Sequence, residues 1–248
     1  MTDFKDTSQS PDRSPDKSTG RQLSENSPPI KSFVRHHGRL TDGQRQALTE
    51  YWPAFGIDFT KRRMDMGTIA EKKYPQVVLE IGFGNGESFI TIAKNHPETL
   101  FIGAEVHRPG VGRALLLAQE NACQNVKIIA HDAVEFIEHM LPDNCLDRVQ
   151  LFFPDPWHKK RHFKRRLVQP HFCRALHRVL KPDAIFHVAT DWVPYAEHVV
   201  DVMASLAGFS DITNNPKEKP SYRPETKFER RGLKLGHEVR DLCFKTVK

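Results

Sequence analysis

The chain has 248 residues and carries 37 Lys and Arg against 31 Asp and Glu, which gives a formal net charge of +6. This length suits one sizeable α/β domain better than two domains. The positive excess favours an anionic partner, such as a nucleic acid, over a cationic one. The excess is moderate, so the distribution of the charges matters more than their sum.

Composition also argues against secretion, membrane insertion and a metal site. The four cysteines are far apart with no Cys-x-x-Cys pair, and the first residues hold no apolar signal segment, so we expect a cytoplasmic protein with reduced thiols. No apolar run approaches the roughly 18 residues that span a bilayer. His158 and His162 stand at helical spacing, but no third ligand lies nearby, so we expect no metal.

Three regions differ in composition. Residues 1–29 consist mainly of Ser, Pro, Asp and Lys, which predicts a disordered tail. Residues 30–74 mix basic and aromatic side chains, and the cap signals Thr41 and Asp42 predict one short helix, as in an N-terminal extension packed on a core. A regular pattern occupies residues 75–248, which we interpret as the main domain.

Strands and helices alternate in this domain. The runs QVVLEIG (76–82) and TLFIGAEV (99–106) are each followed by a helical stretch, and two successive βα units indicate a parallel sheet. Three further strands are expected at 126–132, 147–155 and 184–191, helices at 133–140, 168–179 and 195–208, and two closing, antiparallel strands at 209–213 and 239–247. The sequence therefore predicts a doubly wound, seven-stranded, mostly parallel sheet with helices on both faces.

Acidic residues end three of the predicted strands. Asp132, Asp155 and Asp191 stand at the carboxyl ends of the third, fourth and fifth strands. Ligands of doubly wound sheets bind outside these ends, near the point where the strand order reverses. We therefore expect the acids to mark a binding site.

A glycine-rich turn follows the first strand, in the sequence LEIGFGNGE. Gly82, Gly84 and Gly86 allow a sharp turn and close approach of a ligand, although a tight strand-to-helix connection alone would use them too. The third glycine comes one residue too early for the dinucleotide fingerprint. Glu80 and Glu87 would repel a pyrophosphate, whereas they suit S-adenosylmethionine, which carries a sulfonium and an ammonium group.

Two further acids follow the next strands. Glu105 lies about twenty residues past the glycines, where an acid can accept both ribose hydroxyls of NAD or of S-adenosylmethionine. Asp132 stands where an adenine amino group would lie, but it is equally placed to cap the helix that follows.

The stretch FPDPW is the least ordinary in the chain. Two prolines restrict the backbone around Asp155, which is useful for aiming a side chain, although a rigid turn would explain them as well. Trp157 is suited to stacking on a base or to covering the sheet edge. Six Lys or Arg follow within residues 159–166, and a second basic stretch at 223–238 is expected to form a loop. Such runs are usually solvated surface, but two of them beside one pocket suit a phosphate backbone.

Taken together, FPDPWHKKRHFKRR, EIGFGNGE, ATDW and TKFERRG resemble the tRNA (guanine-N7-)-methyltransferase family, in its bacterial single-chain type. The resemblance extends from about residue 30 to the C-terminus. It implies a class I S-adenosylmethionine-dependent methyltransferase fold and methylation of N7 of the variable-loop guanosine at position 46, which forms 7-methylguanosine. tRNA would be the partner of a monomer, with a homodimer as the alternative.

The resemblance also implies roles for individual residues. Asp155 would be catalytic. The cofactor would bind at Glu80, Gly82, Gly84, Gly86, Glu105, Asp132 and Asp155. The substrate would bind at Lys159, Arg161, His162, Lys164, Arg165, Arg166, Asp191, Thr226, Lys227, Phe228 and Glu229. Asp183 and Ala184 depart from the family, whose members commonly have Gly-Gly there, and this departure concerns only that turn. His158 stands where many members have proline and touches none of the proposed contacts.

The chemistry implied by this resemblance depends on positioning. Guanine N7 carries a lone pair and no proton, so no general base is needed to create the nucleophile. Asp155 or Asp191 could stabilise the positive charge that the ring gains, or accept hydrogen bonds from guanine N1 and N2. We hypothesise that Trp157 or Phe228 stacks on a displaced guanine.

Three other functions remain open at this point. A nicotinamide-dependent oxidoreductase shares the early βαβ pattern and Glu105, but it explains neither the third glycine nor the basic run. A methyltransferase acting on small molecules or proteins leaves the basic segments without a task. A non-catalytic RNA-binding protein needs none of the acids at the strand ends.

Overall fold

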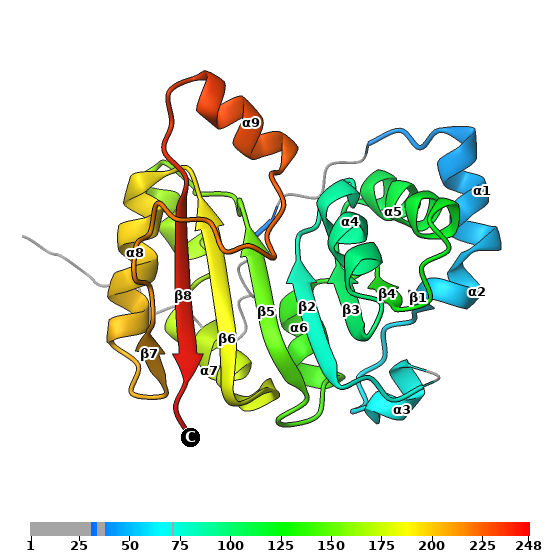
Figure 1. Ribbon diagram of the computed structural model, residues 1–248, viewed down its shortest axis with the longest axis horizontal. Coiled ribbons are helices and arrows are strands. Elements are labelled where there is room, and N and C mark those ends of the chain that lie inside the picture. Colours follow the sequence, from blue (N-terminus) through cyan, green and yellow to red (C-terminus); the bar gives the residue numbers. More distant parts are fainter. Residues whose placement is uncertain (1–30, 34–37, 71) are drawn as a thin grey trace, which may run out of the picture. The chain divides into compact units, whose positions relative to one another are not determined.

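The computed structural model describes residues 31–33, 38–70 and 72–248, except the side chains of Lys227 and Phe228 (Figure 1). The tail predicted at 1–29 lies outside the described residues. Within them, eight strands form one sheet in the order β1-β4-β3-β2-β5-β6-β8-β7. The strands are β1 (Gly56–Ile57), β2 (Gln76–Ile81), β3 (Thr99–Ala104), β4 (Val126–Ile129), β5 (Leu146–Phe152), β6 (Leu180–Thr190), β7 (Phe209–Asp211) and β8 (Arg240–Thr246).

The sheet is mostly parallel, as predicted. Only β8 runs against the other strands, because it is antiparallel to β6 and to β7. The prediction of two antiparallel closing strands is thus right for β8 and wrong for β7, which has the direction of the parallel strands. The expected number of seven strands was one too low, because β1 pairs with the edge of β4 through Gly56 and Ile57 alone. Two residues are too short to show the alternation by which a strand is predicted from sequence.

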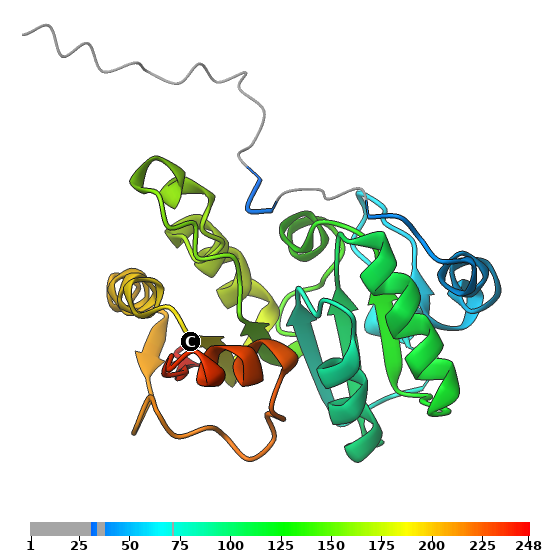
Figure 2. The ribbon, with the colours of Figure 1, turned by 90° about the horizontal axis from the view of Figure 1, so that it is seen from above.

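Helices cover both faces of the sheet (Figure 2). The crossover helices α4 (Glu87–Asn95) and α5 (Arg108–Glu120) lie on one face, and α6 (Ala133–His139), α7 (Pro170–Val179) and α8 (Val193–Ala204) lie on the other. Buried apolar side chains fill both layers, for example Leu79 and Phe186 in one cluster and Phe89 and Phe101 in the other.

The N-terminal helices are short. The predicted helix is α1 (Asp42–Glu50), and Thr41 caps it through a reciprocal pair of bonds with Gln44. It packs so closely on α5 that a Cβ atom at Gly112 would lie 2.9 Å from Cβ of Gln44. The helices α2 (Trp52–Phe55) and α3 (Met66–Ile69) were not predicted, and each is a single turn.

The carboxyl ends of the parallel strands form one edge of the sheet, at the top of Figure 1. From β2 the chain proceeds through β3 and β4 in one direction, and from β5 through β6 in the other. The strand order therefore reverses between β2 and β5. At this edge lies α9 (Lys227–Lys234), which replaces part of the loop predicted at 223–238.

Asp183 lies near the start of β6, where the family resemblance led us to expect glycine, and adopts a left-handed backbone conformation with φ of 59°. A Cβ atom is unfavourable in this conformation, although aspartate tolerates it better than most residues. We predict that Asp183→Gly is more stable than Asp183→Ala by about 1 kcal/mol. Urea unfolding of the two variants measures the difference, and equal midpoints would contradict it.

Candidate functional site

A cavity of about 360 Å³ opens at the carboxyl-end edge, where the strand order reverses. The segments that follow β2, β3, β4 and β5 contribute Gly82, Glu105, Asp132 and Asp155 to its wall. A second cavity of about 820 Å³ contains Glu80, Gly84 and Thr226, and it shares Gly82, His107, Phe152 and Phe153 with the first. The structure thus brings together most of the acids and glycines that were predicted from separate strands, whereas Gly86 and Asp191 line neither cavity.

The three predicted glycines all have positive φ angles, from 62° to 80°. Gly86 is further restricted, because an added Cβ atom would lie 2.6 Å from Cβ of Ala114 in α5. Gly86 therefore lets the start of α4 approach α5. Gly82 and Gly84 have free space beside them, so only their backbone conformation favours glycine there.

Glu80 is the most perturbed acid of the site. It is 3% exposed, and burial raises the pKa of its carboxyl from 4.5 to about 8, although Arg148 opposes the shift. Within the described residues, its Oε2 atom has no hydrogen-bond partner. A buried, unpartnered carboxyl oxygen in a cavity wall fits a cationic ligand, because such a ligand would supply the missing partner.

Backbone amides fix the Glu105 carboxylate. Its Oε2 accepts a hydrogen bond from Gly84 N at 2.9 Å, and its Oε1 accepts from Val106 N at 2.7 Å and His107 N at 2.9 Å. These bonds hold the carboxylate in the cavity wall and link it to the glycine turn. Its remaining lone pairs have the right chemistry for ribose hydroxyls.

Asp132 caps a helix and also lines a cavity. It is the N-cap of α6, with Oδ1 accepting from Val134 N at 3.0 Å, and it also lines the first cavity. Burial raises the pKa of its carboxyl against the effect of that bond. The cap is thus established, and the contact to an adenine stays a prediction.

Backbone strain surrounds Asp155. Phe153 and Trp157 have φ angles of 52° and 48°, which are unusual for bulky side chains. Phe153 N is held by Ala189 O of β6 at 2.8 Å, and Arg166 donates to Pro156 O at 3.0 Å. Such strain persists only where neighbours impose it, and it is typical of functional loops. The carboxylate between them is exposed at the cavity mouth.

The six predicted cations of residues 159–166 differ in burial, and Arg165 is half-buried. Lys159, Lys160, Arg161 and Lys164 are exposed, mostly on a 3₁₀ helix over Lys160–Arg165. Arg166 is only 3% exposed and stacks on the Phe163 ring at 3.7 Å. Arg166 therefore stabilises the loop from inside, whereas its exposed neighbours are free to contact a ligand. Partial desolvation and four nearby cations lower the pKa of His162.

One face of the Trp157 ring is already covered. The Arg165 guanidinium lies 4.0 Å from the ring centroid, and the same group donates to the carbonyls of Lys31 and Phe33. Trp157 Nε1 donates to Ser32 O at 3.1 Å. Stacking of a guanine on Trp157 stays a prediction and needs the opposite face or a shift of Arg165. The Phe228 side chain lies outside the described residues, as does that of Lys227.

Asp191 follows β6 and faces α9. Its Oδ2 pairs with His237 Nδ1 at 3.2 Å, and a Cβ atom at Gly232 would approach the same oxygen to 3.0 Å. The sequence analysis missed His237, which stands just beyond α9. The two residues are 46 positions apart, so no local sequence pattern indicates that they pair.

Thr226 and Glu229 open α9 with reciprocal hydrogen bonds. Thr226 Oγ1 accepts from Glu229 N at 3.0 Å, and Glu229 Oε2 accepts from Thr226 N at 3.2 Å. Both residues are buried, and Thr226 lines the second cavity. The Thr-x-x-Glu spacing is a helix-start signal that could have corrected the loop prediction. Arg223, which binds the Glu229 carboxylate, was also missed.

Two general properties of the described part complete the description. No helix there is long and apolar enough to cross a membrane. Nor do its His, Cys, Asp and Glu side chains form a group of three that could hold a metal ion.

Comparisons with known proteins identify the family. Residues 75–242 match the family model "Putative methyltransferase". The tRNA (guanine-N(7)-)-methyltransferase of Aeromonas hydrophila is 53% identical over 220 residues, which is 88% of this chain and 92% of that protein. The enzyme of the same name from Escherichia coli K12 is 50% identical over 221 residues, with the same coverage.

Solved structures support the fold alone. The 16S rRNA methyltransferase KamB has a TM-score of 0.54 at 18% identity and covers 74% of this chain and 93% of its own. The antibiotic-resistance methyltransferase Kmr has a TM-score of 0.53 at 17% identity, with 77% and 95% coverage. The fold is that of the class I methyltransferases, and these relatives do not favour an oxidoreductase. By its identity to these enzymes and its match to the methyltransferase family model, the chain belongs to the tRNA (guanine-N7-)-methyltransferase family.

Proposed function

We propose that this chain methylates N7 of the guanosine at position 46, in the variable loop of tRNA, with S-adenosylmethionine as the donor. One observation carries the proposal. The strained Pro-Asp-Pro-Trp loop presents Asp155 at the mouth of a cavity that suits the cofactor, directly beside exposed cations that suit RNA. The names of the similar enzymes support the guanine N7 reaction in tRNA.

The residues of the two cavities fit S-adenosylmethionine. The orphaned Glu80 oxygen suits a cationic group, and Glu105, fixed by three amides, suits the ribose. Asp132 is placed for the adenine, and the turn at Gly82, Gly84 and Gly86 leaves room for close approach. When bound, the cofactor supplies an electrophilic methyl group on a positively charged sulfur.

The protein's contribution to the reaction is orientation and charge. N7 needs no deprotonation, so holding the guanine in line is the main requirement. The carboxylates of Asp155, in the wall of the first cavity, and of Asp191, beside α9, stabilise the positive charge that develops on the ring. Neither group has to accept a proton from N7.

The exposed cations Lys159, Lys160, Arg161 and Lys164 hold the tRNA backbone. His162, with its lowered pKa, is neutral near pH 7 and gains charge more readily beside a phosphate. We further propose a cytoplasmic monomer with the domain division at residues 29 and 74. A sedimentation experiment distinguishes the monomer from a homodimer.

Phosphate contacts make tRNA affinity fall as salt rises. We predict that Lys164→Ala weakens tRNA binding several-fold at low salt and reduces the slope of log affinity against log salt by about one. The control is Lys94→Ala, which removes one positive charge from an exposed lysine in the last turn of α4, outside the basic run. Filter binding at salt concentrations from about 50 to about 300 mM measures the salt dependence of tRNA affinity for both variants. An unchanged slope for Lys164→Ala would count against the contact.

The position of methylation needs its own test. A tRNA transcript with guanosine at position 46 should accept about one methyl group, whereas the transcript with adenosine there should accept none. Mapping the 7-methylguanosine by chemical cleavage identifies the site. Methylation at another guanosine would retain the reaction and overturn the assigned position.

A further inference from the structure

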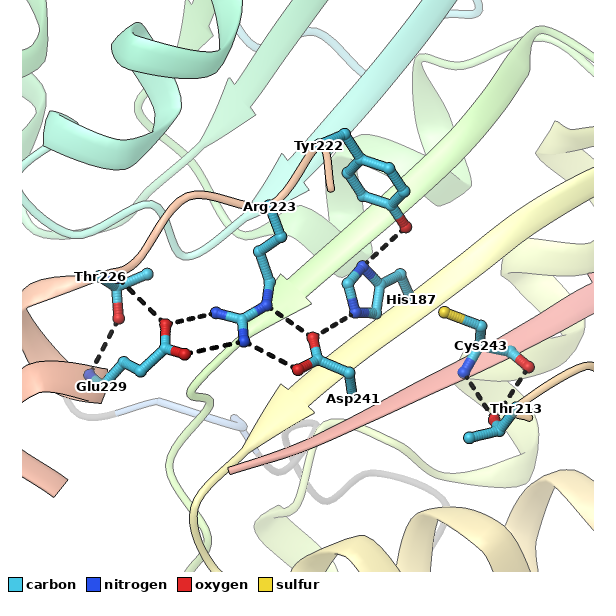
Figure 3. A network of polar contacts seen from close by, with 8 residues as sticks. All are labelled: His187, Thr213, Tyr222, Arg223, Thr226, Glu229, Asp241 and Cys243. Carbon is cyan, nitrogen blue, oxygen red and sulfur yellow. Dashed lines mark hydrogen bonds and ion pairs between the residues drawn. The ribbon is translucent and has the colours of Figure 1, made fainter. Parts of the chain in front are cut away.

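A buried arginine joins α9 to the sheet (Figure 3). The Arg223 side chain is 0% exposed and lies between two carboxylates. Its Nη1 and Nη2 atoms donate to Glu229 at 2.6 and 3.1 Å, and its Nε and Nη2 atoms donate to Asp241 at 2.6 and 2.8 Å. Both pairs are bidentate, which fixes direction as well as distance.

The two carboxylates belong to different parts of the fold. Glu229 lies in the first turn of α9 and forms the reciprocal cap with Thr226, which lines the second cavity. Asp241 lies in β8, directly opposite Ala189 of β6. The Arg223 guanidinium therefore connects the start of α9 to the sheet. Without it, two buried carboxylates would face each other with no cation between them.

The same guanidinium also reaches the strand that leads to Asp155. Its central carbon lies 5.8 Å from the Phe152 ring centroid and 5.9 Å from that of Phe153. Phe153 is the first residue of the strained loop, and both rings line the two cavities. Arg223 thus packs against the Asp155 loop on one side and holds the Thr226 turn on the other.

A second set of bonds fixes Asp241 itself. Asp241 Oδ1 lies 2.7 Å from His187 Nε2, and Tyr222 Oη lies 2.9 Å from His187 Nδ1. Burial lowers the pKa of His187, which suits a neutral ring that donates to Asp241 and accepts from Tyr222. Arg148 stacks on the Tyr222 ring at 3.9 Å and covers the far end of this chain of bonds. Asp241 is therefore held by His187 as well as by Arg223.

We propose that Arg223 is a positioning residue for methyl transfer, which holds the Thr226–Glu229 turn in register with the Asp155 loop. The inference rests on the proposed function and deepens it. Arg223 touches neither the exposed cations of residues 159–164 nor Glu105. We therefore expect its loss to lower turnover much more than it weakens cofactor or tRNA binding, because Glu105 and the exposed cations keep their own contacts.

The test compares Arg223→Lys with Arg174→Lys, a matched change at an exposed arginine on α7, outside both basic stretches. Lysine keeps the charge but cannot form both bidentate pairs. We expect kcat of Arg223→Lys to fall at least 30-fold, with dissociation constants for cofactor and tRNA within about threefold of wild type. Arg174→Lys should keep wild-type kcat. A folded Arg223→Lys protein with kcat within twofold of wild type would overturn the proposal.

Asp241→Asn provides a second, nearly isosteric variant in case Arg223→Lys does not fold. Asp241 reaches the site through Arg223 and also through His187, whose ring packs on Phe152 with centroids 5.0 Å apart, so we expect a loss of kcat at least as large, with retained binding. The kcat of the double variant should be no lower than that of the worse single variant, because both changes break the same Arg223–Asp241 pair. Additive losses, or a loss of cofactor affinity instead of kcat, would contradict the inference. Wild-type protein that transfers no methyl group in this assay would instead refute the proposed function.

Discussion

Asp155→Asn is expected to lower kcat about 100-fold or more, with little change in cofactor affinity or stability. The carboxylate is exposed at the cavity mouth, so its replacement leaves no buried group unpaired. The amide keeps the shape of the side chain but cannot stabilise the positive charge that the guanine ring gains. Single-turnover methyl transfer measures the chemical step directly.

Asp201→Asn is the control for this change, because Asp201 is an exposed carboxylate on α8, away from both cavities. It should retain the wild-type rate. An Asp155→Asn enzyme with wild-type kcat would remove Asp155 from the chemistry. A raised KM for tRNA with unchanged kcat would assign it to binding alone.

Glu80→Gln is expected to weaken S-adenosylmethionine binding about 10- to 100-fold at pH 8.5 and to remove most of the pH dependence of that binding. In the free protein the Glu80 carboxyl has a pKa of about 8, so it is largely protonated at pH 7. A cationic ligand favours the carboxylate, and binding therefore releases a proton. Wild-type affinity should rise between pH 6 and 8, by at most about tenfold per pH unit.

Calorimetry in buffers of different ionisation enthalpy counts the released proton. The cofactor's own amine titrates as well, so the difference between wild type and Glu80→Gln isolates the Glu80 contribution. Equal proton release by the two proteins would mean that Glu80 does not ionise on binding.

The same raised pKa has a consequence for stability. The folded protein binds more protons than the unfolded chain between pH 4.5 and 8, so the free energy of unfolding falls as pH rises through this range. The slope contributed by Glu80 is at most about 1.4 kcal/mol per pH unit. Glu80→Gln should flatten the curve of urea midpoint against pH.

The parallel sheet could be predicted because its signals are local. Apolar runs such as 76–82 and 99–106 predict buried strands, and the glycines and acids stand directly at or after the ends of these strands. Asp132, Asp155 and Glu105 therefore came together as expected, since carboxyl ends of parallel strands share one edge. The family resemblance added the substrate, which no pattern of strands reveals.

The burial of individual arginines could not be predicted in the same way. Arg161 and Arg166 belong to one basic run, yet Arg161 is exposed, whereas Arg166 is buried against Phe163 and Pro156. In the sequence, Arg223 looks like any basic residue of a loop, because its partner Asp241 lies 18 residues further along the chain, in a strand. The burial of an arginine depends on partners that are distant in the sequence. The helix α9 was missed for another reason: its many charged side chains resemble a loop, although its N-terminal cap signal was present.

The central claim is that guanine N7 at the Asp155 loop receives the methyl group. The most direct measurement is methyl transfer from labelled S-adenosylmethionine to two tRNAs that differ only at position 46, one with guanosine and one with 7-deazaguanosine. We predict about one methyl group on the first and none above background on the second, with similar affinity for both tRNAs. Equal transfer to both tRNAs, or no transfer to either while the cofactor binds, would contradict the account.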